Sequence, residues 1–486
     1  MRVTDSSPRG GLAIPRRGEA RGPVERLLRA ANRPVDAASL GAFRLLFGAM
    51  MAFGLARFVA QGWVDKVLVE PTFFFKFPGL SWTWVGPPPL LYLHFGITAA
   101  AAIALGLGWR RRLGAVVFFV GFTYLQLLDV TLYLNHYYLV VLLAGFLVLL
   151  PAERALSVVN PTGPATVPAW CIHLLRFQVA VVYVFAAVAK LHPDWLRYGQ
   201  PLGMWMRART ELPLVGPLLD EPWLPLAMSW AGFLYDATIW IFLLVPSTRA
   251  LAYAAVLVFH FFTALFFEIG MFPVIMVVAT TVFFAPDWPR RWIPGLASGR
   301  PGERPAVGRG PEAVASPAPE PAALGRPRLA LLAAYVALQV ALPLRHFALP
   351  GDVLWNERGM RFSWKVMVRE KNGDIRYWVR LPSGREREVS ALDYLTWRQY
   401  SDMSGQPDLI HQLGRHIGWD FEKRGEGPVE VRVDAWVSLN GRAPARLVDP
   451  DVDITRLSSP YDPRWLRPAP AGPPLTQRPA RAQASP

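Results

Sequence analysis

Long apolar blocks alternate with short polar connections over the first 348 residues of this 486-residue chain. An apolar block of about 20 residues is long enough to cross a bilayer as a helix. Nine blocks reach or approach this length, at about residues 38–60, 89–108, 113–131, 135–151, 168–190, 228–245, 250–268, 270–285 and 327–348. The pattern therefore predicts a polytopic α-helical membrane protein with about nine transmembrane helices.

After the last block, short runs of alternating apolar and polar residues indicate strands of a water-soluble domain. Asn372-Gly373 and Asn440-Gly441 each separate two such runs and predict the turns of two β-hairpins. The strand pairs expected from these turns are 361–369 with 375–380 and 429–439 with 443–448. Helical patterns at about 391–403 and 407–418 complete the domain, residues 349–460, which is predicted to be α+β with an antiparallel sheet.

Composition divides the rest of the chain. Three stretches rich in Arg, Pro, Gly or Ala lack an apolar pattern and are expected to be disordered. The expected units, in order, are a basic disordered N-terminal tail (1–34), a transmembrane domain (35–294), a disordered cytoplasmic linker (295–326), the last transmembrane helix (327–348), the soluble domain (349–460) and a disordered tail (461–486).

The formal net charge of +15 comes from 45 arginines and 6 lysines against 36 acidic residues. The arginines gather in the tail, the linker and short loops such as 109–112 and 246–249, so a nucleic-acid partner is not expected. Basic loops stay on the cytoplasmic side of a membrane, which places the N-terminus inside. An odd number of spans then places the soluble domain outside. Heavy use of Arg and Ala is typical of a GC-rich bacterium, so we expect the cytoplasmic (inner) membrane.

The single cysteine, Cys171, lies in an apolar block, so no intramolecular disulfide is expected. No cleavable signal peptide is evident. The histidines at 136, 173, 192 and 260 lack the spacing of a ligand set, so no metal site is expected. Phosphate-binding glycine loops and the Gly-x-Ser-x-Gly motif are absent from the sequence as well.

Ionisable residues within apolar blocks mark functional sites by default, because charge is costly in lipid. Lys190 closes the fifth block, in a chain that elsewhere prefers arginine. An amine in a dry setting can lose its proton and act as a base, which a guanidinium cannot; alternatively, the lysine snorkels to the membrane surface. Arg176, Tyr183 and Lys190 are seven residues apart and share one helix face over about 21 Å. This stripe is either a functional site or a polar seam between helices.

Asn135 and His136 begin the fourth block, on the same side of the membrane as Lys190. An aromatic belt explains the tyrosines that follow but not the Asn-His pair. Arg44, Asp236 and His260 are further candidates within the blocks, and the charges of Arg44 and Asp236 would neutralise each other if they met.

A series of short stretches runs through both parts of the chain, at 39–48, 135–139, 182–195, 259–260, 269–272, 285–290, 362–368, 437–442 and 448–450. Taken in this order, these stretches resemble the vitamin K-dependent gamma-glutamyl carboxylase family, including bacterial relatives that share its horizontally transferred transmembrane domain. Each is short, but together they run through both parts of the chain, and those in the soluble domain favour the carboxylase branch.

The resemblance implies carboxylation of protein glutamate to gamma-carboxyglutamate, coupled to epoxidation of vitamin K hydroquinone, with O2 and CO2 as co-substrates. Lys190 is then the base that deprotonates the hydroquinone, and His136 and Asn135 lie beside the quinone and the reacting glutamate. Arg176, Tyr183 and His260 line the same cavity. The implied partners are the lipid bilayer, a quinone and a Glu-containing exported protein or peptide.

Two other functions stay open: epoxidation of vitamin K or menaquinol without carboxylation, and non-enzymatic binding of a lipid or a partner at the membrane. The chain also departs from the animal enzymes, which join the first outer loop to the outer domain by a disulfide. Here that loop, residues 73–77, has no cysteine. Docking of the soluble domain is therefore expected to depend on noncovalent packing.

Overall fold

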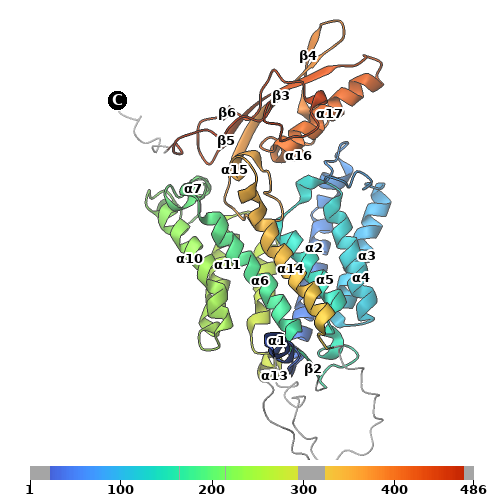
Figure 1. Ribbon diagram of the computed structural model, residues 1–486, viewed down its shortest axis with the longest axis vertical. Helices are drawn as coiled ribbons and strands as arrows, with labels where there is room; N and C mark the ends of the chain where they lie inside the picture. Colours follow the sequence, from blue (N-terminus) through green and yellow to red (C-terminus); the bar gives the residue numbers. More distant parts are fainter. Residues whose placement is uncertain (1–21, 164, 214, 294–322, 476–486) are drawn as a thin grey trace, which may run out of the picture.

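The computed structural model describes residues 22–163, 165–213, 215–293 and 323–475. A bundle of long helices forms one part, and a domain built on a β-sheet, residues 349–475 (the sheet domain), sits over one end of it (Figure 1). Most of the expected linker, up to residue 322, lies outside the described residues, as do 1–21 and 476–486 of the two tails.

Each of the nine apolar blocks forms a helix in the described part of the chain. These helices are α2 (Ala38–Ala60), α3 (Pro88–Leu107), α4 (Arg111–Leu127), α5 (Asn135–Leu149), α6 (Ala169–Lys190), α10 (Leu224–Leu244), α11 (Arg249–Phe266), α12 (Phe272–Thr280) with the 3-10 turn η4 (Thr281–Phe283), and α14 (Arg326–Leu344). Six of them are long and apolar enough to cross a membrane, whereas α4, α5 and α12 are shorter. The chain is therefore a mostly helical membrane protein, as its apolar pattern predicts.

Glycines allow α2 and α3 to pack closely. A Cβ added at Gly48 would lie 2.4 Å from the Cα of Gly106, so a larger residue there would force the helices apart. Small residues serve this purpose in membranes because lipid supplies no hydrophobic force between helices. One turn earlier, the buried Arg44 donates to the carbonyl oxygens of Leu105, at 3.2 Å, and Leu156. Arg44 thus satisfies backbone carbonyls, including one at the end of α3.

Short elements lie between the long helices and, after α14, lead into the sheet domain. They are η1 (Asp65–Val69), η2 (Val130–Leu132), η3 (Ala152–Arg154), α7 (Pro193–Leu196), α8 (Leu202–Arg207), α9 (Gly216–Leu219), α13 (Trp288–Trp292), η6 (Arg345–Ala348) and α15 (Val353–Asn356). Of these, α7 directly follows the end of α6 and contributes to the site described below.

Part of the N-terminal tail that was expected to be disordered is folded, at the end of the bundle opposite the sheet domain (Figure 1). Residues Pro23–Ala31 form the amphipathic helix α1, and β1 (Pro34–Asp36) pairs antiparallel with β2 (Thr166–Pro168). Arg290 fixes this strand by donating to both carboxylate oxygens of Asp36, at 3.0 and 3.2 Å. The Arg-rich average composition hid the helical spacing of the apolar residues in α1.

The sheet domain contains an antiparallel four-stranded sheet in the order β4–β3–β5–β6. The strands are β3 (Lys371–Arg380), β4 (Glu386–Val389), β5 (Glu430–Leu439) and β6 (Ala445–Arg446), with helices α16 (Trp397–Met403) and α17 (Pro407–Lys423) and the short turns η7 (Ala391–Asp393) and η8 (Ile454–Arg456). Alternate residues of β5, from Val431 to Leu439, are buried, and α17 packs against this strand. One face of the sheet therefore forms the core of this domain, and the predicted α+β class is confirmed.

Of the two predicted hairpins, the second is confirmed and the first is wrong. β5 and β6 pair across a turn that begins at Asn440-Gly441, where φ is 50° and 81°. Asn372-Gly373 instead lies inside β3, and β3 turns into β4 at residues 381–385. Gly373 has a packing role, because a Cβ there would lie 2.4 Å from the carbonyl oxygen of Ser404.

The segment 361–369, predicted to be a strand, is irregular. Phe362, Trp364 and Met367 have φ values of 62°, 56° and 54°. This left-handed region excludes β pairing. The segment leaves the sheet and runs toward the bundle, where Trp364 is buried among membrane helices.

Residues 461–475, expected to belong to a disordered tail, pack on the sheet domain. Trp465 is fully buried, and Leu466 forms a β-bridge with Val448. The proline-rich composition predicted disorder, but burial of Trp465, with Leu466 half-buried beside it, fixes the segment.

The sheet domain docks on the bundle through noncovalent contacts. Phe75 and Phe77, in the loop between α2 and α3, are buried in the apolar core of the sheet domain. Between them, the backbone of Lys76 exchanges two hydrogen bonds with the side chain of Gln412, at 2.9 and 3.1 Å. This loop contains no cysteine, so apolar packing and hydrogen bonds, and not a disulfide, join it to the sheet domain.

Candidate functional site

Lys190 is the last residue of α6, and the protein surrounds its side chain. The helix is apolar over its last three turns and ends before Pro193, which cannot continue it. The Lys190 side chain is only 7% exposed. It points into the protein, so the snorkelling alternative does not describe it.

An aspartate on a neighbouring helix is the partner of Lys190. The Nζ atom lies 2.7 Å from Oδ2 of Asp236 on α10, and 3.4 Å from the carbonyl oxygen of Ala186. The Asp236 side chain is 8% exposed, and the ring centroid of Trp195 lies 5.1 Å from Nζ. The site therefore holds a buried lysine–aspartate pair rather than the solitary lysine that the sequence suggested.

A cavity of about 90 Å³, the Lys190 cavity, opens beside this pair. Tyr183 and His260 line it together with apolar side chains, which include Trp195, Met228, Phe259, Phe267, Phe272, Met276, Val366 and Met367. Both ring nitrogens of His260 are buried without a hydrogen-bond partner among the described residues. Buried polar atoms are normally satisfied, so these nitrogens mark a place where a polar ligand or a water molecule would bind.

His136 and Asn135 lie beside the Lys190 cavity without lining it. The rings of His136 and His260 lie 5.8 and 5.6 Å, between centroids, from the ring of Phe272. The Nε2 atom of His136 is buried and has no partner within the described ranges. Asn135 donates to the carbonyl oxygen of Lys365 at 3.2 Å. Asn135 therefore helps to hold the segment that brings Val366 and Met367 into the cavity wall.

Arg176 lies 14 residues, or about 21 Å of helix, from Lys190 and does not line the Lys190 cavity. Its guanidinium donates to the carbonyl oxygens of Val282, Phe283 and Phe284 at 2.8–3.3 Å. These carbonyls belong to the end of the η4 turn and need such a donor. Arg176 borders a separate cavity near β1 and β2. Of the three residues on the predicted stripe, Tyr183 and Lys190 meet in the Lys190 cavity, and Arg176 does not.

Asp236 is the site residue whose role the sequence left undecided. An acidic residue in an apolar helix signals a partner, and Arg44 was the partner considered. The structure pairs Asp236 with Lys190. Arg44 instead donates to the backbone carbonyl oxygens of Leu105 and Leu156. The choice depends on which helices cross, and neither composition nor periodicity contains that information. The sequence also did not identify three residues of the cavity wall, because the arrangement of the elements brings them there: Trp195, Val366 and Met367.

Two family models match this chain. The HTTM domain matches residues 32–288, which include Lys190, Asp236 and His260. The lumenal domain of vitamin K-dependent gamma-carboxylase matches residues 325–471, which comprise the last long helix and most of the sheet domain. No solved structure matches the chain.

Proposed function

Because the chain belongs to the vitamin K-dependent gamma-carboxylase family, we propose that it carboxylates glutamate residues of an exported protein or peptide. The coupled reaction consumes a vitamin K hydroquinone, O2 and CO2, and releases the quinone epoxide and water. One observation carries the proposal: the buried Lys190–Asp236 pair faces an apolar cavity in which the ring nitrogens of His260 have no hydrogen-bond partner among the described residues.

The residues of the Lys190 cavity fit a quinol. Its ring has two apolar faces and a hydroxyl group at each end, so it needs aromatic walls and a few polar atoms. Phe267 and Phe272 supply such walls, and Lys190 and His260 supply polar atoms. The cavity is smaller than a typical ligand site of roughly 300–1,000 Å³. Methionine side chains are flexible, and rotation of those in the wall would admit the ring.

The γ-carbon of glutamate is too weak an acid for a side-chain base at neutral pH. When bound, the hydroquinone supplies, through oxygen, the stronger base that this step requires. The protein supplies a destination for the hydroxyl proton: the amine of Lys190 takes it and shares it with the carboxylate of Asp236, 2.7 Å away. His260, in the cavity wall, provides a hydrogen bond to developing negative charge. The apolar walls exclude water, which protects a reactive carbon centre.

One assay distinguishes this function from the alternatives. The purified protein receives reduced vitamin K, labelled bicarbonate and a Glu-rich peptide. We expect label in the peptide and an equal amount of epoxide. Epoxide without labelled peptide would instead establish a quinol epoxidase, and the absence of both products in a protein that still binds the quinol would establish a binding protein.

Lys190 is tested by Lys190→Arg, which keeps a positive charge beside Asp236 but holds its proton at any accessible pH. We expect folded protein whose epoxide formation falls by at least 100-fold, a size typical of losing a positioned acid–base group. Epoxide at the parent rate would overturn the assignment of Lys190.

Lys190→Ala alone is a poor test, because it leaves Asp236 as an unpaired buried charge at a cost of about 3–5 kcal/mol. The double variant Lys190→Met/Asp236→Leu removes both charges and keeps the volume. We expect it to melt within a few degrees of the parent and to form no epoxide, which separates loss of chemistry from loss of fold.

A further inference from the structure

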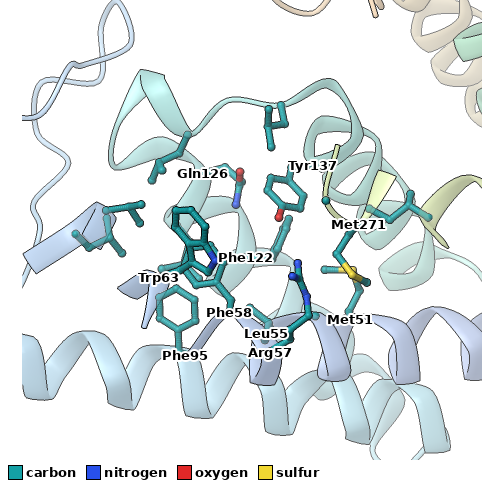
Figure 2. Close-up of a pocket in the computed structure, with 18 of the residues that line it drawn as sticks. Met51, Leu55, Arg57, Phe58, Trp63, Phe95, Phe122, Gln126, Tyr137 and Met271 are labelled. Atoms are coloured by element: carbon teal, nitrogen blue, oxygen red, sulfur yellow. The ribbon is translucent and has the colours of Figure 1, made fainter. Parts of the chain in front are cut away.

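A second cavity, of about 260 Å³, lies beside the Lys190 cavity (Figure 2). Neighbouring side chains of α12 face the two spaces: Met271 and Ile275 line the second, and Phe272 and Met276 line the first. His136 lies next to one wall residue of each cavity. Its ring centroid is 4.5 Å from that of Tyr137, which lines the second cavity, and 5.8 Å from that of Phe272, which lines the Lys190 cavity. His136 and α12 therefore separate two cavities of different chemistry.

Arg57 gives the second cavity, called here the Arg57 cavity, its charge. Its guanidinium and the hydroxyl group of Tyr137 point toward the same space (Figure 2). One guanidinium nitrogen donates to Gln61 at 2.9 Å, and the buried Nε atom finds no acceptor in the described part of the chain. Arg57 makes no ion pair with any described residue. The buried Oε1 atom of Gln126, also in the wall, lacks a donor there too.

The apolar walls of the cavity strengthen the interaction of the Arg57 guanidinium with an anion. Phe58, Trp63 and Phe122 form an aromatic lining around it. Apolar side chains that shield an ion from water strengthen its hydrogen bonds; Arg57 is half-buried, and its Nε atom is buried against these walls. An arginine also matches a carboxylate with two parallel hydrogen bonds, which few other anions allow as well. The Arg57 cavity thus has the charge, shape and surroundings to hold a carboxylate on an apolar chain.

The cavity lies at the junction with the sheet domain. Arg398 of α16 forms part of the wall and is fixed by donating to the carbonyl oxygen of Thr131 at 2.8 Å. Arg398 also forms an ion pair with Asp402, at 3.6 Å. Its charge is therefore already balanced by a carboxylate, whereas Arg57 has no such partner among the described residues. A ligand that reaches this junction comes from the side of the membrane on which the sheet domain lies.

We propose that the Arg57 cavity binds the side-chain carboxylate of the glutamyl residue to be modified, an inference that rests on the proposed function. The γ-carbon is bonded to that carboxyl group, so a carboxylate held at Arg57 keeps the γ-carbon within the same cavity. His136 and α12 lie along the boundary with the Lys190 cavity, the side from which the base formed on the quinol would reach this carbon. An aspartyl side chain, shorter by one methylene, would reach less far past the carboxylate.

The test measures peptide binding without turnover. The full chain in phosphatidylcholine nanodiscs, without quinone, is titrated with a fluorescent Glu-containing peptide and with the same peptide carrying Gln. We expect the parent to prefer the Glu peptide. Arg57→Gln weakens binding of the Glu peptide by at least tenfold and leaves the Gln peptide unchanged, and Arg57→Lys restores part of the preference.

Arg209→Gln is the matched control. It removes one positive charge on the same side of the protein, where Arg209 pairs with the exposed Glu268 at 2.8 Å, away from the cavity. Its affinity for both peptides should equal that of the parent. Equal affinity of the parent for the two peptides, or an equal loss for both in Arg57→Gln, would overturn the proposal.

An anionic lipid is the competing occupant, and nanodiscs with phosphatidylglycerol test it. If Arg57→Gln abolishes retention of that lipid but keeps the preference for the Glu peptide, the Arg57 cavity is a lipid site and the proposal is wrong. The proposed function fails differently, through the absence of epoxide and labelled peptide from the parent enzyme. In turnover, Arg57→Gln should raise KM for the peptide at least tenfold and leave KM for the quinol unchanged.

Discussion

Lys190 and Asp236 act as a unit, because each is buried and each is the charge that balances the other. The sequence indicates each of them separately. A lysine appears where the chain prefers arginine, and an acidic residue interrupts an apolar helix. Their pairing, on which the proposed proton transfer rests, depends on the crossing of α6 and α10. That crossing is a property of the fold and explains why the candidate site was predicted only in part.

Lys371 predicts a pH dependence for the stability of the sheet domain. Its buried Nζ donates to the carbonyl oxygens of Trp355, at 2.6 Å, and Gly405, and lies 3.5 Å from a carboxylate oxygen of Glu357. Burial lowers the pKa of Lys371 to about 8, although Glu357 acts in the opposite direction. Between pH 8 and the ordinary value of 10.5, the unfolded chain holds a proton that the folded domain has released. The unfolding free energy should therefore rise with pH in this window.

Hydrogen exchange of the β3 amides, corrected for intrinsic rates, measures this effect at pH 8 and pH 10 in the parent and in Lys371→Met. We expect the parent to gain protection relative to the variant by about 1–3 kcal/mol, since one pKa unit corresponds to about 1.4 kcal/mol. A difference between the two proteins that does not change with pH would contradict the prediction.

At the scale of elements, α7 connects the end of α6 to the sheet domain. Asp194 of α7 is buried and accepts hydrogen bonds from Arg442 at 2.6 and 2.7 Å and from Asn440 at 2.9 Å. Burial alone would raise the pKa of Asp194, but these hydrogen bonds outweigh it and lower the pKa. The carboxylate therefore keeps its charge, and the contact its strength, until the pH falls below the usual aspartate range.

Asp194→Asn should loosen this junction by about 3–5 kcal/mol, the usual result of leaving a buried ionic partner unpaired. Limited proteolysis of the region between α6 and α10 measures the effect. Arg464→Gln is the control, because Arg464 is 75% exposed and pairs with Asp462 at the surface, where such pairs contribute at most about 1 kcal/mol. Cleavage that is equally slow in Asp194→Asn and in the parent would show that the contact does not hold the domain.

The elements also show which local signals can be trusted. Blocks of apolar residues predicted each of the nine long helices of the described bundle, because length and hydropathy act locally. The same Asn-Gly dipeptide marks a turn at 440–441 and lies within a strand at 372–373, where close packing on Ser404 requires a glycine. The irregular course of 361–369 comes from its contacts with the bundle, and the segment around Trp465 owes its order to a buried apolar residue that average composition conceals.

At the scale of the whole molecule, α1 and the sheet domain lie at opposite ends (Figure 1), which predicts their separation by the membrane. Ser383, in the β3–β4 turn, and Ser247, between α10 and α11, are both exposed. In intact cells, a membrane-impermeant maleimide should label Ser383→Cys and leave Ser247→Cys unlabelled until lysis. The native Cys171 is buried and should give little background. The reverse labelling pattern would invert the proposed topology.

The loop at residues 73–77 has one more consequence. Its contacts with the sheet domain are apolar burial and hydrogen bonds, and the chain has a single thiol. Assembly of the two parts therefore needs neither an oxidant nor a disulfide isomerase, and a reducing agent has no bond to cleave within the chain. A host with a reducing interior should produce the same docked protein as one with an oxidising export pathway.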